Sequence, residues 1–196
     1  MINAESDLKK LVDGLDFDIS LFNGLWDSEM NVRDINSYDD LISLYPVDGS
    51  SWSHSAHNLW FGHMVLSELY SSVLNYREAI ADSFRYSCDL SIDGVPYDIK
   101  LALLPVDVLI PENLEDEGFK ASLINRLYDD VEVWDVNCLF VVHLNQSNPL
   151  DSWKLMANTS STDKSVGEFL SGDVAVLNNI NISGNNVSSG IIWVLG

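Results

Sequence analysis

Three features of the 196-residue sequence predict an α/β (α+β) fold. Residues 55–74 carry apolar side chains at helical spacing, residues 86–104 alternate around an Asp-Gly turn, and residues 133–144 are almost all apolar. These patterns are typical of an amphipathic helix, a β-hairpin and a strand buried on both faces. Their order along the chain indicates a sheet whose strands are partly joined by helices.

The N-terminal part of the chain predicts an acidic, mainly helical segment over residues 1–53, packed on a core domain at 54–196. Asp7–Leu15 has apolar residues at helical spacing, which favours a first short helix. A second short helix is expected after Ser37, whose hydroxyl can cap it, and Pro46 is expected to end it.

The remaining elements are expected in chain order within the core domain. Periodicity predicts helices, apolar runs predict strands, and clusters of Pro, Gly, Asn and Ser predict loops. The expected helices are 55–74, 76–84 and 119–128; the expected strands are the hairpin, 133–144, 153–157, 174–177 and 191–195; the expected loops are 105–118 and a polar turn region at 178–189.

The hairpin is the most informative stretch of the sequence. Asp93-Gly94 is a favoured two-residue turn, because both central positions need positive φ. Counting outward from this turn gives the cross-strand pairs Ile92–Val95, Ser91–Pro96, Leu90–Tyr97 and Asp89–Asp98. Because side chains alternate along a strand, one face is apolar and the other is polar. The apolar face holds Leu90, Ile92, Val95, Tyr97, Ile99 and Leu101.

Two carboxylates face each other on the polar side of this hairpin. Asp89 lies opposite Asp98, and Lys100 follows two residues later on the same face. Directly opposed like charges destabilise a sheet. A divalent cation is the usual means of compensating clustered carboxylates, so the pattern predicts a metal site. The alternative is a solvent-facing hairpin side with an ordinary salt bridge.

Asp89, followed across a tight hairpin by Asp98-Ile99-Lys100, resembles the core of the PD-(D/E)XK nuclease superfamily. The resemblance covers roughly residues 55–145 and implies a restriction-endonuclease-like fold, which has a mixed central sheet flanked by helices. It implies that Asp89, Asp98 and the backbone carbonyl of Ile99 hold Mg²⁺ or Mn²⁺, and that Lys100 helps to activate water. Glu68, on the preceding helix, is the expected additional acid. The implied activity is DNA endonuclease cleavage, and a homodimer is implied as well.

The chain departs from the pattern of this family at three places. Cys88 stands where the family often has proline before the first Asp. Leu101 and Ala102 follow the lysine where many members have polar residues, which weakens the expected contact with DNA. Pro96 lies in the second hairpin strand, and proline in an interior strand requires a bulge or an edge.

The charge of the chain argues against a phosphate-binding surface. Ten Lys and Arg against 30 Asp and Glu give a net charge of −20. Nucleic-acid binding normally needs a basic patch. The charge fits adaptation to a salt-loaded cytoplasm, where molar salt shortens the Debye length to about 3 Å. It equally fits a non-catalytic acidic binding protein, either a nucleic-acid mimic or a degenerate nuclease fold that binds a protein partner. Hydrolysis of another phosphate ester is a third possibility.

Other candidate groups in the sequence have simpler interpretations. His54 and His57 could share one helical face, but no third zinc ligand is placed beside them. His143 is expected to be a core histidine, and Cys88 and Cys138 to be small buried residues. The sequence shows no signal peptide and no membrane-spanning run, so we expect a cytoplasmic protein without a membrane partner.

Overall fold

The computed structural model describes most of the chain and divides it into two compact units. The first unit comprises Met1–Ser71 with Met156–Ser160, and the second comprises Ser72–Leu155 with Ser161–Gly196. The described residues are 4–14, 32–76, 88–105, 107–129, 131, 136–172 and 177–196.

Helices form the first unit. They are α1 (Ala4–Val12), α3 (Tyr38–Leu44) and most of α4 (Ser51–Tyr76). The cap predicted at Ser37 is confirmed, because its side chain accepts a hydrogen bond from the Asp40 backbone N–H at 3.1 Å. Helix α1 begins three residues before the predicted Asp7 and buries Leu8 and Leu11.

Helix α4 extends the predicted 55–74 helix at both ends, to 26 residues. Its apolar side buries Phe61, Val65, Leu69 and Val73, as the helical spacing predicts. Of the further helix expected at 76–84, Tyr76 is the last residue of α4, and residues 77–84 lie outside the described residues. No helix among the described residues is long and apolar enough to cross a membrane.

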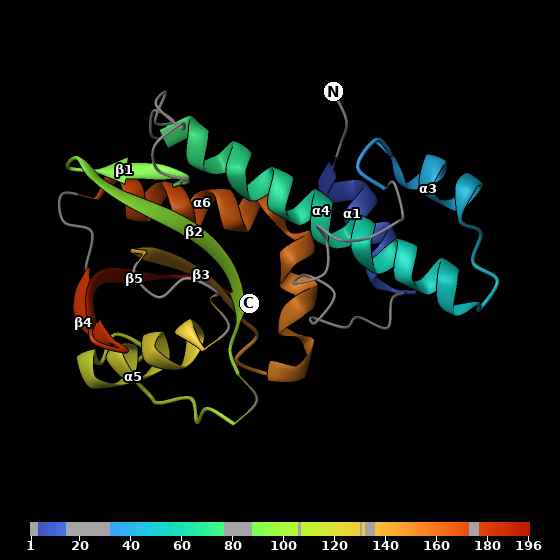
Figure 1. The fold of residues 1–196 in the computed structure, drawn as a ribbon. Helices are drawn as coiled ribbons and strands as arrows, with labels where there is room; N and C mark the ends of the chain where they lie inside the picture. The colour runs from blue at the N-terminus through green and yellow to red at the C-terminus, as the bar shows by residue number, and fades with distance from the viewer. Residues whose placement is uncertain are drawn as a thin grey trace. The chain divides into compact units, whose positions relative to one another are not determined.

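A five-stranded mixed sheet forms the centre of the second unit (Figure 1). Its strand order is β1-β2-β3-β5-β4. The outer pairs β1–β2 and β4–β5 are antiparallel, whereas β2–β3 and β3–β5 are parallel. The strands are β1 (Leu90–Ile92), β2 (Val95–Leu103), β3 (Cys138–Leu144), β4 (Asn178–Ile182) and β5 (Asn185–Leu195).

Two helices cover opposite faces of this sheet. α5 (Glu117–Tyr128) packs on the face that presents Phe140 and Ile191, and its Leu123, Ile124 and Leu127 belong to that core. α6 (Thr159–Ser171) covers the other face, where a Cβ on Gly190 would meet Phe169 at 3.2 Å. All seven residues of β3 are buried, which confirms a strand covered on both sides.

The strand predicted at 153–157 is wrong. Pro149–Ala157 instead forms a 3₁₀ helix, η1. Local side-chain bonds favour this tight turn: Asn145 Oδ1 accepts from the backbone N–H groups of Ser147 and Asn148, each at 3.0 Å. Lys154 also pairs with Asp151, three residues before it, at 3.0 Å. A 3₁₀ helix has three residues per turn, so side chains three positions apart lie on the same face. In an extended strand the same two side chains would lie on opposite faces and far apart.

The polar turn region predicted at 178–189 is also wrong, because it contains β4 and the start of β5. Ser183 and Gly184 have φ of 50° and 92° and form a two-residue hairpin turn. Ile180 and Ile182 point into the core, whereas the intervening Asn181 is exposed. Of the strand expected at 174–177, residues 174–176 lie outside the described residues, and residue 177 precedes β4.

Candidate functional site

Three of the four cross-strand pairs predicted from the turn are confirmed; the fourth, Asp89 with Asp98, is not a ladder pair, because β1 begins at Leu90 and the Asp89 N–H donates to Tyr97 O at 3.0 Å. The structure pairs Leu90 with Tyr97, Ser91 with Pro96 and Ile92 with Val95. Asp93 and Gly94 have φ of 52° and 81°, as the turn requires. Leu90, Ile92, Tyr97 and Ile99 are buried, whereas Val95 is exposed because it directly follows the turn.

Pro96 is accommodated although β2 is an interior strand. The Asp98 backbone N–H donates to Asn137 O at 2.9 Å, which identifies the side of β2 that faces β3. The nitrogen of Pro96 faces the same side, because alternate residues of a strand share a direction. Pairing with β3 begins only at Asp98, opposite Cys138. The missing N–H of Pro96 therefore removes no ladder bond.

Asp98 has one oxygen bound and one oxygen buried without a partner. Its Oδ2 lies 3.2 Å from Lys100 Nζ, and the two side chains are 17% and 41% exposed. Its Oδ1 has no hydrogen-bond partner among the residues that the structure describes. A buried carboxylate oxygen without a partner is costly, because it has lost its water. Asp98 is therefore suited to bind a further positive group.

Asp89 lies one step beyond the Leu90–Tyr97 pair and is tied to the backbone of β2. The Ile99 backbone N–H donates to Asp89 Oδ2 at 2.8 Å. Burial raises the pKa of Asp89, and the nearby Asp98 raises it further, although the Ile99 N–H and Lys100 act in the opposite direction. The two carboxylates thus interact electrostatically, although they are not a paired position of the hairpin ladder.

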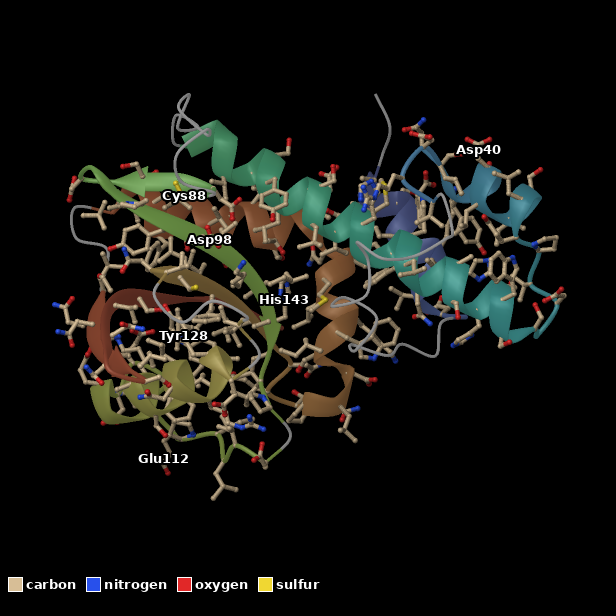
Figure 2. All side chains as sticks on the ribbon, in the orientation of Figure 1. Asp40, Cys88, Asp98, Glu112, Tyr128 and His143 are labelled. Atoms are coloured by element: carbon tan, nitrogen blue, oxygen red, sulfur yellow. The ribbon has the colours of Figure 1, made fainter. Side chains whose placement is uncertain are left out.

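The thiols of Cys88 and Cys138 lie close enough to Asp89 and Asp98 for the two carboxylates to raise the pKa of each thiol. Burial raises the pKa of Cys88, and the charges of Asp98 and Asp89 add to the rise. Burial also raises the pKa of Cys138 to about 11. Both cysteines are free, Cys88 half-buried and Cys138 fully buried. Figure 2 shows Cys88 and Asp98 at the hairpin end of the second unit. Neither thiol is poised to ionise. The burial expected of both cysteines is confirmed for Cys138 only, because Cys88 is half-buried.

Asn137 holds the start of β2 in place and was not singled out by the sequence. Its Nδ2 donates to Pro96 O at 3.0 Å, and its Oδ1 accepts from the Ser188 N–H at 2.8 Å. The backbone carbonyl of Asn137 also accepts a hydrogen bond from the Asp98 N–H. Asn137, which directly precedes β3, therefore links β2 to β5. No local pattern reveals this role, because its partners lie 41 and 51 residues away.

Glu68 lies in the part of α4 that belongs to the first unit, whereas the hairpin belongs to the second. Its side chain is half-buried. Among the described residues, the structure shows no group of three or more His, Cys, Asp or Glu side chains that could hold a metal ion. The contribution of Glu68 to the site stays a prediction.

The histidines have structural partners. The ring of His57 is buried, with Nε2 2.7 Å from the carbonyl of Tyr45. His143 is fully buried, with Nε2 3.0 Å from Thr162 Oγ1, and burial lowers its pKa to about 4. His143 is therefore the core histidine that the sequence predicts. The bond from His57 to the backbone favours a structural role over a metal site on α4.

The basic residues from the hairpin onward are paired with acids. Lys100 pairs with Asp98, and Lys120, only 5% exposed, pairs with Glu115 and Glu117 at 3.1 and 2.9 Å. The remaining pairs are Arg126 with Asp129 and Asp107, Lys154 with Asp151, and Lys164 with Glu168. These five cations therefore form no open basic patch for a phosphate backbone.

Comparisons of the chain with protein-family models, curated proteins and solved structures give no match. The geometry of the hairpin and the resemblance of its residues are therefore the grounds on which a function is proposed.

Proposed function

We propose that this protein is a metal-dependent phosphodiesterase, with DNA as its expected substrate and an endonuclease of the PD-(D/E)XK type as the specific class. One observation carries the proposal: Asp89, Asp98 and Lys100 meet on one hairpin, and Asp98 Oδ1 is buried without a partner among the described residues. The order of helix, antiparallel hairpin, helix and parallel strand agrees with the fold that the resemblance implies.

The residues present suit Mg²⁺ or Mn²⁺. Asp89 and Asp98 supply two carboxylates, and the Ile99 carbonyl is the expected third oxygen. Mg²⁺ usually takes one or two carboxylates and completes its shell with water and substrate phosphate, so a cage of three acidic side chains is not required. A cation between the carboxylates would also relieve their mutual repulsion and satisfy Asp98 Oδ1.

The residues of the hairpin have distinct roles in this proposal. A bound Mg²⁺ would supply Lewis-acid polarisation of the phosphate and a more acidic water. Asp89 keeps its orientation through the Ile99 N–H, which leaves Oδ1 for binding. Lys100 gives up its pairing with Asp98 and, as an ammonium, donates a hydrogen bond that positions the attacking water; to deprotonate that water it must first release its own proton to solvent. Its positive charge also stabilises the charge that develops on the phosphate.

The charge of the protein constrains the substrate. Phosphate backbones are attracted by unpaired cations, and the basic residues from Lys100 onward are paired. We therefore propose that a small number of metal and Lys100 contacts hold the scissile phosphate, and that cleavage requires high salt, where long-range repulsion is screened. A homodimer remains part of the proposal through the resemblance alone.

Plasmid cleavage with Mg²⁺ or Mn²⁺, measured from 0.05 to 2 M KCl, tests this function. We expect Lys100→Ala to reduce the rate at least about 100-fold, since it removes the side chain proposed to position or deprotonate the attacking water. Lys154→Ala is the matched control, because Lys154 is similarly exposed and pairs with Asp151 at 3.0 Å. Its rate should equal that of the wild type.

Calorimetric titration with Mn²⁺ separates metal binding from cleavage. Asp98→Asn should weaken Mn²⁺ binding at least about tenfold, because it removes one of two charged ligands. Absence of metal-dependent cleavage at every salt concentration would overturn the proposal. Equal losses in Lys100→Ala and Lys154→Ala would overturn the role of Lys100.

A further inference from the structure

The first unit exposes a concentration of large apolar side chains at one place. Leu44, Val47 and Trp52 are 65%, 70% and 56% exposed. Eight large hydrophobic residues are at least 37% exposed among the described residues, and three of them fall within nine positions of the sequence. We call these three residues the 44–52 surface. Single exposed apolar residues are ordinary, whereas a cluster of them marks an interaction site.

The chain between α3 and α4 is folded back on itself by contacts within the segment that carries Leu44, Val47 and Trp52. The rings of Tyr45 and Trp52 lie 6.4 Å apart in a tilted arrangement. The Ser53 hydroxyl donates to the carbonyl of Pro46 at 2.6 Å, and Asp48 Oδ1 accepts from the Ser50 N–H at 2.8 Å. The apolar side chains are thus presented by an internally bonded segment.

The sequence around this surface is acidic, although Lys10 of α1 lies 5.9 Å from the centroid of the Tyr38 ring, beside Asp39. Residues 34–76 contain five Asp and Glu and no Lys or Arg. The exposed acids that flank the surface are Asp39 and Asp40, on α3, and Asp48; Asp40 is labelled in Figure 2. An apolar centre with an acidic rim complements a segment that carries apolar and basic residues together.

We propose that the 44–52 surface is a docking site for a Lys- and Arg-rich amphipathic segment of a protein partner, with Trp52 as its central anchor. Tryptophan is enriched among the residues that dominate binding energy. The acidic rim argues against other occupants, because a second copy of this chain, an anionic membrane and a nucleic acid would each bring further negative charge. This interaction is independent of the proposed hydrolysis.

An 18-residue helical peptide of leucine and lysine is a suitable probe, with the whole protein in 0.15 M KCl and binding followed by calorimetry. We expect saturable binding that weakens at least tenfold in Trp52→Ala and likewise in Val47→Lys. Both positions are largely exposed, and circular dichroism would verify folding. Leu109→Ala is the matched control, because Leu109 is 89% exposed in the second unit and should leave the affinity unchanged.

Peptides that lack either the apolar or the basic residues show whether both kinds of residue are needed for binding to the 44–52 surface. An oligolysine of equal charge and a leucine–glutamate helix should each bind at least tenfold more weakly than the leucine–lysine helix. Unchanged affinity in Trp52→Ala and Val47→Lys, or equal binding of oligolysine, would overturn the proposal. Self-association in sedimentation that Trp52→Ala abolishes would assign the surface to a second copy instead.

Discussion

At the scale of single residues, Asp89 combines two functions that oppose each other. Its Oδ2 accepts the Ile99 N–H and so secures the end of the hairpin, whereas its charge is held near Asp98. A group placed to bind a ligand is often unfavourable for the stability of the free protein. The cost of this arrangement can be measured, because asparagine keeps the acceptor oxygen and removes the charge.

We expect Asp89→Asn to raise the thermal midpoint at neutral pH in the presence of EDTA. Burial raises the pKa of Asp89 in the folded state, so the folded protein holds this proton more tightly than the unfolded chain. The stability contributed by this group is present below its ordinary pKa and is lost as the pH rises through the folded-state pKa. The gain in Asp89→Asn should therefore vanish in acid.

The same substitution should remove stabilisation by Mn²⁺, since a ligand that binds only the folded state raises the midpoint. Asp93→Asn is the matched control: it neutralises an exposed carboxylate in the same hairpin, and Asn-Gly keeps the favoured turn. A lower midpoint for Asp89→Asn at neutral pH, or an equal rise for Asp93→Asn, would contradict this account of Asp89.

At the scale of elements, the start of the parallel sheet depends on the side chain of Asn137. Replacing Asn137 with alanine removes the partners of Pro96 O and Ser188 N. We expect a loss of about 1–3 kcal/mol in the free energy of unfolding, because a backbone group left without a partner retains its desolvation cost. Chemical denaturation followed by circular dichroism measures the loss.

Asn125→Ala provides the comparison for Asn137→Ala. The Asn125 side chain donates to Ala121 O on the exposed side of α5. Its removal should change stability by no more than about 0.5 kcal/mol, as is usual for surface substitutions. Similar losses at the two positions would show that Asn137 is not a structural link between β2 and β5.

The sequence predicts elements well where local chemistry and periodicity agree. The Asp93-Gly94 turn and the alternation around it determine the hairpin register, and Ser37 determines the start of α3. The β4–β5 hairpin was missed because asparagines, which are depleted in strands, occupy its exposed positions. A period of two at Ile180 and Ile182, followed by Ser-Gly, was the available signal.

The sequence predicts that Asp89, Asp98 and Lys100 lie on one hairpin, but it predicts only part of their hydrogen bonding. Turn chemistry places Asp89, Asp98 and Lys100 on one face. The hydrogen bond from the Ile99 N–H to Asp89 depends on where β1 begins. The burial of Asp98 Oδ1 depends on how β2 pairs with β3. Such contacts arise from pairings of residues far apart in the sequence, which no local pattern encodes.

At the scale of the whole molecule, the charge of −20 is the dominant property. The division between the two units falls inside α4, between Ser71 and Ser72, where no change of composition marks it. Acidic residues occur in both units, so their repulsion opposes the compact state throughout. Surface ion pairs such as Lys154–Asp151 compensate little of it.

We expect the thermal midpoint to rise by about 5 °C between 0.05 and 0.5 M KCl, because screening reduces this repulsion. NaCl at the same ionic strength should act equally, and glucose at the same osmolality should have a much smaller effect. Differential scanning calorimetry measures the midpoints. A midpoint that is independent of salt would show that the charge does not limit stability and would remove the argument from salt adaptation.

The separation of paired residues along the chain has a kinetic consequence for the carboxylate pair. Leu90 pairs with Tyr97 within a few positions, whereas Asp98 pairs with Cys138 40 positions away. A hairpin forms in roughly 1–10 μs, and parallel pairing must first close a long loop. Asp89 and Asp98 therefore meet early, while water still surrounds them. The electrostatic barrier arises later, when β3 docks and expels that water, so docking of β3 is the folding step that a bound cation would accelerate.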